Sequence, residues 1–137
     1  MHTVAVLVLP GVVPFDLSTP CEVFGRVRLA NDRAGYDVRV CGIERDVPAG
    51  AFTVRPRWRL RTLAKADTVI IPGVADPLAP VPIAVVRAIR RAAERGCRIA
   101  SICSGAFVLA ATGLLDGRRA TTHWLAADQL ASIQLSL

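Results

Sequence analysis

The stretch IASICSGAFVLAATGLLDGRRATTHW, residues 99–124, decides the fold that we expect for this chain. It opens as a short apolar strand, passes through Cys103, and enters a helix of small residues predicted over 104–115. A side chain at such a junction sits on a tight turn over the end of the sheet. The small residues Ser104 and Gly105 relieve the backbone crowding there. The sequence therefore predicts that Cys103 lies at the carboxyl end of a buried strand.

Two interpretations of Cys103 follow from its position. Free N–H groups at the start of the next helix carry partial positive charge, which favours a reactive thiolate over a thiol. The alternative is an inert buried cysteine, which is common in protein cores. The pattern of strand, Cys, Ser, Gly and helix favours the reactive site over the inert one.

Working outward, buried strands alternate with helices along the chain. We expect strands at residues 3–9, 36–43, 67–71 and 97–102, and helices at 17–31, 83–95 and 104–115. Residues 52–60 read as one or two short strands outside the main sheet. In the helix over 83–95 we expect four residues to face inward: Ile83, Val86, Ile89 and Ala93. The alternation predicts a parallel α/β sheet, whose ligands bind beyond the carboxyl ends of the strands.

The composition fits one domain with a large aliphatic core. The chain has 137 residues, of which 53% are hydrophobic, and its 17 basic and 11 acidic residues give a formal charge of +6. This charge permits contact with nucleic acid without establishing it. Arg55, Arg57, Arg59 and Arg61 alternate as on one face of a strand; phosphate binding and a solvated edge hairpin both fit, and the hairpin is favoured.

Metal, cofactor and membrane roles find no support in the sequence. The four cysteines and two histidines form no zinc-binding spacing, so we expect no metal and no cofactor. We interpret the cysteines as free thiols in a reducing cytoplasm. No apolar run approaches the ~18 residues of a membrane-spanning helix, so no membrane partner is expected.

Asp16 and His123 are the candidate partners of the thiol. Asp16 follows the first strand by seven residues, so its carboxyl group could hold a proton or orient the thiol. The alternative, a helix N-terminal charge or cap, is the more common role. His123 lies twenty residues beyond Cys103 and could act as a base. The alternative for His123 is an imidazole packed by Trp124 and hydrogen-bonded to the backbone.

Gly73 and Val74 are the candidate ligand-binding residues, together with Ser104. Gly73 and Val74 follow the end of a predicted strand, and their backbone N–H groups could join that of Ser104 as donors to an oxyanion. An ordinary strand-ending turn is the alternative, because Pro72-Gly73 signals such turns in most proteins.

Taken together, these residues resemble the ThiJ/PfpI superfamily of class I glutamine-amidotransferase-like domains. The resemblance runs over residues 3–131 and is most specific in ICSGAFVLAATGLLDGRRATTHW, with support from LVLPGVVPFDLSTPCEVFG and DTVIIPGV. It implies a three-layer, flavodoxin-like domain over residues 1–137. By position, Cys103 matches the elbow cysteine, Asp16 the acidic residue of the isonitrile hydratase pocket, and His123 the T-T-H histidine. Ser104 stands where the hydratase usually has Thr.

Within this superfamily, the sequence of these motifs is most similar to that of two groups. One is the N-terminal domain of AraC-type regulators, which implies a small-molecule sensor and homodimer whose DNA contacts need a domain absent from this chain. In that case Cys103, Asp16 and His123 are vestigial as catalytic residues. The other group is isonitrile hydratase, which adds water to an isonitrile to give a formamide, with Cys103 as nucleophile and Asp16 as acid/base. Reversible oxidation of Cys103 in a redox protein is a third hypothesis.

Two departures from the superfamily pattern shape these expectations. Ser104 stands where PfpI-type peptidases have a histidine after the cysteine, which argues against peptidase activity. The ending ASIQLSL does not resemble the usual continuation, so we expect the closing strands and helix to be missing. An open sheet edge and self-association of the chain would follow.

Overall fold

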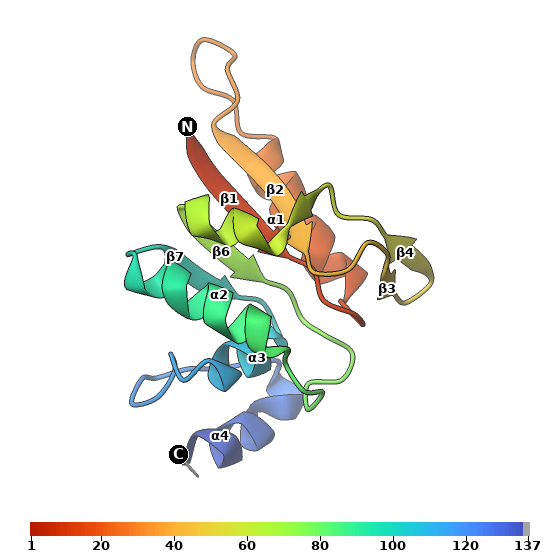
Figure 1. Ribbon diagram of the computed structural model, residues 1–137, viewed down its shortest axis with the longest axis vertical. Coiled ribbons are helices and arrows are strands. Elements are labelled where there is room, and N and C mark those ends of the chain that lie inside the picture. Colours follow the sequence, from red (N-terminus) through yellow and green to blue (C-terminus); the bar gives the residue numbers. More distant parts are fainter. Residues whose placement is uncertain (136–137) are drawn as a thin grey trace.

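The first apolar run forms the middle strand of the sheet. In the computed structural model, which describes residues 1–135, β1 (His2–Leu7) pairs in parallel with β2 (Tyr36–Gly42) and β6 (Thr68–Ile71). β7 (Arg98–Ser101) pairs with β6, and β5 (Trp58–Arg59) pairs with β2, both also in parallel. The strand order is β5-β2-β1-β6-β7. The predicted parallel α/β sheet is confirmed (Figure 1).

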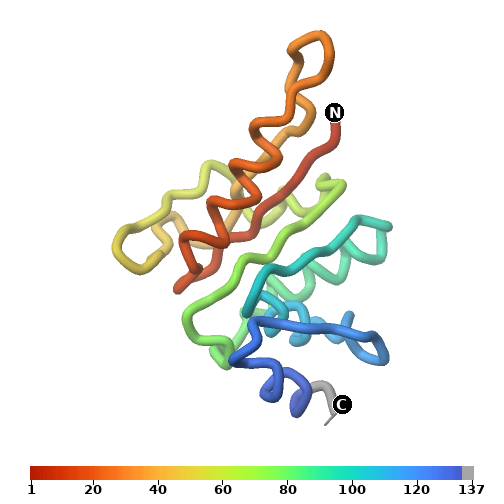
Figure 2. The backbone as a smooth tube through the Cα atoms, turned by 180° about the vertical axis from the view of Figure 1, so that it is seen from behind, coloured from red at the N-terminus to blue at the C-terminus, as the bar shows by residue number. Residues whose placement is uncertain are grey.

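Side chains of β1 alternate between two cores, one on each face of the sheet. Val4 and Val6 pack on the side of α1 (Pro14–Gly25), whereas Ala5 and Leu7 pack on the side of α2 (Ile83–Glu94) and η1 (Leu60–Lys65). Figure 2 shows α1 on the near side of the sheet and α2 on the far side. A strand covered on both faces is apolar at every position, which explains the continuous run that begins the chain.

Two predicted helices are shorter than expected. The helix predicted over 17–31 is α1, and it ends at Gly25. Beyond it, Arg28 and Ala34 form an antiparallel bridge around a turn, because this stretch holds the turn formers Asn31, Asp32 and Gly35. The helix predicted over 104–115 is α3 (Gly105–Ala111), and the chain leaves it through Gly113, whose φ is +80°.

The buried residues of α2 differ from most of those predicted. Val85, Ile89 and Ala92 are its buried residues, and Ile83 is 63% exposed. The helix begins at Ile83, and Val85 is its first buried residue. Only Ile89 was predicted correctly as a buried position.

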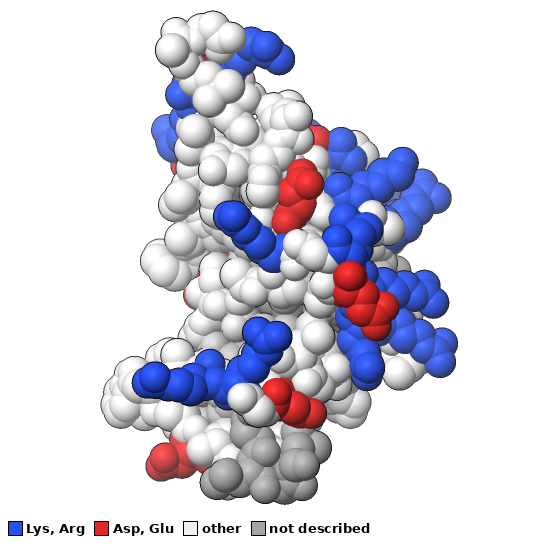
Figure 3. Space-filling view, turned by 90° about the vertical axis from the view of Figure 1, so that its left-hand side faces the viewer, with Lys and Arg blue, Asp and Glu red and all other residues white. Residues whose placement is uncertain are grey.

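Residues 52–60 do not form the single alternating strand that would align the four arginines. β4 (Phe52–Val54) pairs with β3 (Val47–Ala49) outside the main sheet, but β5 joins the main sheet beside β2. Pro56 separates β4 from β5, so the arginines from Arg55 to Arg61 occupy different elements. Figure 3 shows that basic side chains gather on one side of the molecule, and Arg61, Arg87 and Arg91 line a groove between η1 and α2.

The chain ends in two short helices. η2 (Trp124–Ala126) leads into α4 (Ala127–Leu135), where Leu130 is buried against Ala106, Phe107 and Ala110 of α3. Residues 136 and 137, the last two of the ending ASIQLSL, lie outside the described residues.

β7 has one free edge within residues 1–135. The N–H groups of Arg98 and Ile102 donate to carbonyls on the β6 side, namely those of Asp67 and Ile71. Alternate residues of a parallel strand face the same neighbour. The N–H groups of Ile99 and Ser101 therefore point away from β6, toward an edge that a further strand can join.

We expect the 137-residue chain to self-associate through this edge and to bind a hydrophobic dye. Ile99→Pro removes a free-edge donor and leaves the β6 hydrogen bonds in place, so it should shift the chain toward monomer in sedimentation velocity. Ala100→Pro is the matched control, because it removes a donor to β6 and should lower the melting temperature instead. A monomeric, dye-silent wild-type chain would contradict this prediction, as would a folded Ile99→Pro chain that still associates.

Candidate functional site

Cys103 occupies a strained turn between β7 and α3. Its φ is +55°, a left-handed conformation that costs a residue with a side chain about 1 kcal/mol or more. The turn is fixed from both sides, because the Ile102 N–H donates to the Ile71 carbonyl at 2.9 Å and the Gly105 N–H donates to the Ile102 carbonyl at 2.9 Å. Cys103 is partly exposed, and its sulfur has no hydrogen bond within the described residues. A tight turn of this kind between a strand and a helix is what a nucleophile elbow requires.

Asp16 reaches the same corner from the first turn of α1. Only 7% of it is exposed, and its Oδ2 accepts a hydrogen bond from the Gly73 N–H at 3.2 Å. It does not cap its own helix, since Val13 is the N-cap and no side chain caps there. Of the alternative considered for Asp16, the cap is therefore not seen, whereas the acidic charge in the first turn of the helix is.

Gly73 lies between the carboxylate and the elbow. A Cβ atom built on Gly73 would overlap Asp16 Oδ2, and it would lie 3.0 Å from Ser104 Oγ and 3.4 Å from the Cys103 Cβ. Only glycine fits this position, because the three side chains already fill the space around it. Asp16, Ser104 and Cys103 thus come together around one backbone segment.

Ser104 holds Val74 through two hydrogen bonds. Its Oγ accepts from the Val74 N–H and donates to the Val74 carbonyl, both at 2.9 Å, and 7% of Ser104 is exposed. The N–H groups of Gly73 and Val74, expected as donors to an oxyanion, are therefore already bonded to side chains. The Ser104 N–H has no partner within residues 1–135, so it is the free donor that remains beside the thiol.

His123 is not joined to the thiol in this structure. Its Nδ1 accepts from the Leu125 N–H at 3.3 Å, and its ring stacks on Trp124 with centroids 6.0 Å apart. This is the packed, backbone-bonded alternative of the two considered from sequence. The T-T-H segment still reaches the elbow, because Thr122 Oγ1 donates to the Cys103 carbonyl at 2.8 Å. Sequence reasoning missed Thr122, although its place beside His123 in T-T-H was the available signal.

The three other cysteines lie in different surroundings. Burial raises the pKa of Cys41 to about 12, and burial is also the main cause of the raised pKa values of Cys21 and Cys97. Among residues 1–135, no three His, Cys, Asp or Glu side chains are grouped so as to hold a metal ion. In the same part of the chain, no helix has the length and apolar character needed to cross a membrane.

The sequence is similar to several curated proteins. A protein from the cpoL 5′ region of Streptomyces lividans is 42% identical over 135 residues, covering 95% of this chain and 93% of that protein. The HTH-type transcriptional regulator CdhR of Pseudomonas aeruginosa is 42% identical over 80 residues, 58% of this chain and 24% of the regulator. Isonitrile hydratase of Pseudomonas putida is 32% identical over 133 residues, 93% of this chain and 54% of the enzyme.

The fold of this chain also matches the folds of solved structures. A two-domain protein of Anabaena variabilis, which contains DJ-1/ThiJ/PfpI-like and ferritin-like domains, superposes with a TM-score of 0.77. The match covers 97% of this chain and 38% of that protein, at 24% identity. The pattern of the DJ-1/PfpI family matches residues 2–136. By this match and by its sequence relatives, the chain belongs to the DJ-1/PfpI family.

Proposed function

We propose that this chain is the ligand-sensing domain of an AraC-type transcriptional regulator. The observation that carries the proposal is the 42% identity to CdhR over 80 residues. In this proposal the domain works as a cytoplasmic homodimer, and DNA contacts belong to a domain outside these 137 residues. The chain spans about a quarter of CdhR, so the regulator's properties enter here only as part of the proposal.

The geometry of the elbow supports binding better than turnover. No imidazole contacts the Cys103 sulfur within the described residues, and Asp16 Oδ2 is engaged by the Gly73 N–H. The Ser104 N–H and the partly exposed thiol still offer a donor and a polarisable contact to a ligand. Cys103, Asp16 and His123 are then residues that shape a pocket rather than a catalytic set.

An isonitrile-hydratase-like enzyme is the second candidate. It is favoured by 32% identity over 133 residues and by the grouping of Asp16 and Cys103 around Gly73. In this chemistry the Cys103 thiol gives its proton to Asp16 as the sulfur bonds to the isonitrile carbon, and Asp16 passes that proton to the same carbon, which gives a thioimidate. Water then adds to this carbon. One of its protons goes to the nitrogen and the other to the departing sulfur, which releases a formamide and regenerates the thiol.

One pair of measurements separates the two candidates. With cyclohexyl isonitrile, we expect little or no N-cyclohexylformamide by mass spectrometry, because no base is joined to the thiol. In a strain lacking the gene, we expect altered transcript levels for a defined set of genes, restored by the wild-type gene. Robust formamide production that is lost in Cys103→Ala and in Asp16→Asn, with unchanged transcripts, would reject the sensor and establish the enzyme.

A further inference from the structure

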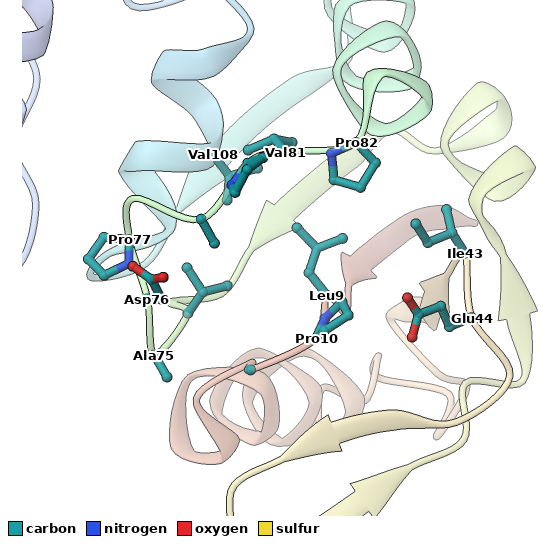
Figure 4. Close-up of a pocket in the computed structure, with 14 residues that line it drawn as sticks. Leu9, Pro10, Ile43, Glu44, Ala75, Asp76, Pro77, Val81, Pro82 and Val108 are labelled. Atoms are coloured by element: carbon teal, nitrogen blue, oxygen red, sulfur yellow. The ribbon is translucent and has the colours of Figure 1, made fainter.

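A separate apolar cavity lies beside the elbow, at the carboxyl edge of the sheet. It has a volume of about 240 Å³ and is lined by chain that follows β1, β2 and β6, with Val108 of α3. Figure 4 shows Leu9, Ile43 and Val81 around its apolar interior. Drug-sized ligands occupy cavities of roughly 300–1,000 Å³, so the occupant of this one must be smaller.

The wall formed by residues 74–82 is stiff and poor in hydrogen-bond donors. Pro77, Pro80 and Pro82 have no N–H group and a fixed φ. Hydrogen bonds hold the remaining loop: the Ala75 N–H donates to the Gly11 carbonyl at 2.8 Å, and the Leu78 N–H donates to Asp76 Oδ1 at 3.1 Å. The wall is therefore formed before any ligand binds, which lowers the entropic cost of binding.

The charge around the cavity is opposite to that of the chain. Although the chain has 17 basic residues, none of them lines the cavity, and two acidic residues, Glu44 and Asp76, do. Figure 4 shows these carboxylates on opposite sides of the apolar interior. Neither carboxylate has an ion-pair partner within residues 1–135.

We propose that this cavity binds a small ammonium compound with a compact hydrocarbon body. The hydrocarbon covers Leu9, Val81 and Val108, and the ammonium group meets Glu44 or Asp76 at the rim. Anions are excluded, because the lining has carboxylates and lacks any cation to pair with them.

Val74 connects this cavity to the elbow. It lines the cavity, and both its N–H and its carbonyl are held by Ser104, the residue after Cys103. An occupant of the cavity therefore touches a residue that is hydrogen-bonded to the side chain that follows Cys103. The biological meaning of this binding rests on the proposed sensing function, but the binding itself does not.

The test is an NMR titration of the ¹⁵N-labelled 137-residue chain at low salt with three matched probes. Cyclohexylmethylammonium should shift the amide signals of Gly11, Ala75, Asp76 and Ala79 in a saturable way. Neutral cyclohexylmethanol should bind about threefold or more weakly, because an exposed charge pair contributes under ~1 kcal/mol. Cyclohexanecarboxylate should leave the signals unmoved. Equal shifts with all three probes, or shifts confined to other residues, would overturn the proposal.

Substitutions test whether Glu44 and Asp76 are the charges that favour binding of the ammonium compound. Glu44→Gln with Asp76→Asn should raise the dissociation constant for the ammonium about three- to fivefold, while the Asn side chain keeps an acceptor for the Leu78 N–H. Glu22→Gln with Asp128→Asn removes the same charge away from the cavity and should leave it unchanged. Ala79→Phe should fill the cavity and abolish binding, with the amide spectrum reporting that the chain remains folded. Unchanged affinity in the first pair would overturn the proposal.

The outcomes for the cavity and for the sensing function are separable. Ammonium binding without any transcript change in the deletion strain would reject the sensing function and keep the cavity. A transcript change without ammonium binding at the cavity would reject the ligand assignment and keep the sensing function.

Discussion

Iodoacetamide is expected to modify Cys103 well ahead of Cys21, Cys41 and Cys97. Alkylation needs an accessible thiolate. Cys41 is fully buried and its pKa is raised to about 12, so at about pH 7 only about one molecule in 10⁵ carries its thiolate. Burial also raises the pKa values of Cys21, inside α1, and Cys97, before β7. Cys103 lies on a turn, is partly exposed, and has no hydrogen bond at its sulfur within the described residues.

Peptide mapping by mass spectrometry after brief alkylation of the native chain measures this order. Denaturing the chain in urea before alkylation should bring the four rates close together, because burial then no longer separates them. Cys21→Ser is a suitable control, since it removes the other partly exposed thiol and should leave the Cys103 rate unchanged. If Cys21 reacts first in the native chain, the interpretation of Cys103 as a reactive elbow is wrong.

Replacing Gly105 with alanine is expected to destabilise the chain by about 3 kcal/mol, a loss of about 10 °C in melting temperature. A Cβ on Gly105 would overlap the Ile71 carbonyl oxygen and lie 2.8 Å from the Pro72 carbonyl oxygen. Both atoms belong to the backbone at the end of β6, so neither can rotate away as a side chain would. Helix α3 would have to move off the sheet, and the elbow with it.

Gly25→Ala is the matched substitution for this test. Gly25 is also helical, at the end of α1, and no atom lies within 4 Å of a Cβ built there. Alanine at this position should leave stability unchanged or raise it by up to about 1 kcal/mol. Thermal unfolding followed by circular dichroism compares the two variants. Equal melting temperatures for Gly105→Ala and the wild type would show that α3 does not rest on β6 as closely as described.

The elements with strong hydrophobic periodicity were the ones predicted well. β1 and β6 are apolar on both faces because two layers cover them, and such runs are visible without any knowledge of contacts. The less accurate predictions concern helix ends and faces. Residues 26–35 have no local feature that forbids a helix as strongly as a proline does, and their bridge from Arg28 to Ala34 depends on how the chain returns to β2.

The pairing of β5 with the main sheet could not be predicted from the sequence either. The strand has two residues, and its partners are Cys41 and Gly42 of β2. A strand this short carries almost no period, so only the packed structure assigns it to one sheet or another.

For the candidate site, the sequence by itself determined at which edge of the sheet the site residues lie. The apolar runs predicted strand ends at residues 9, 71 and 102, close to the observed ends at Leu7, Ile71 and Ser101, and parallel strands bring their carboxyl ends to one edge. Cys103, Asp16 and Gly73 were therefore expected at that edge before any contact was known. The small residues after Cys103 also identified the tight turn, because turn geometry is a local property of the backbone.

Only the tertiary structure decided which groups bond there. Asp16 meets Gly73 across 57 positions of sequence, Ser104 meets Val74 across 30, and Thr122 rather than His123 meets Cys103 across 19. Such contacts depend on rotations and displacements of whole elements by a few ångströms. A periodic pattern determines which face of an element is buried, but hydrogen bonds form only within about 3.5 Å, and that distance is set by the packing of all three layers together.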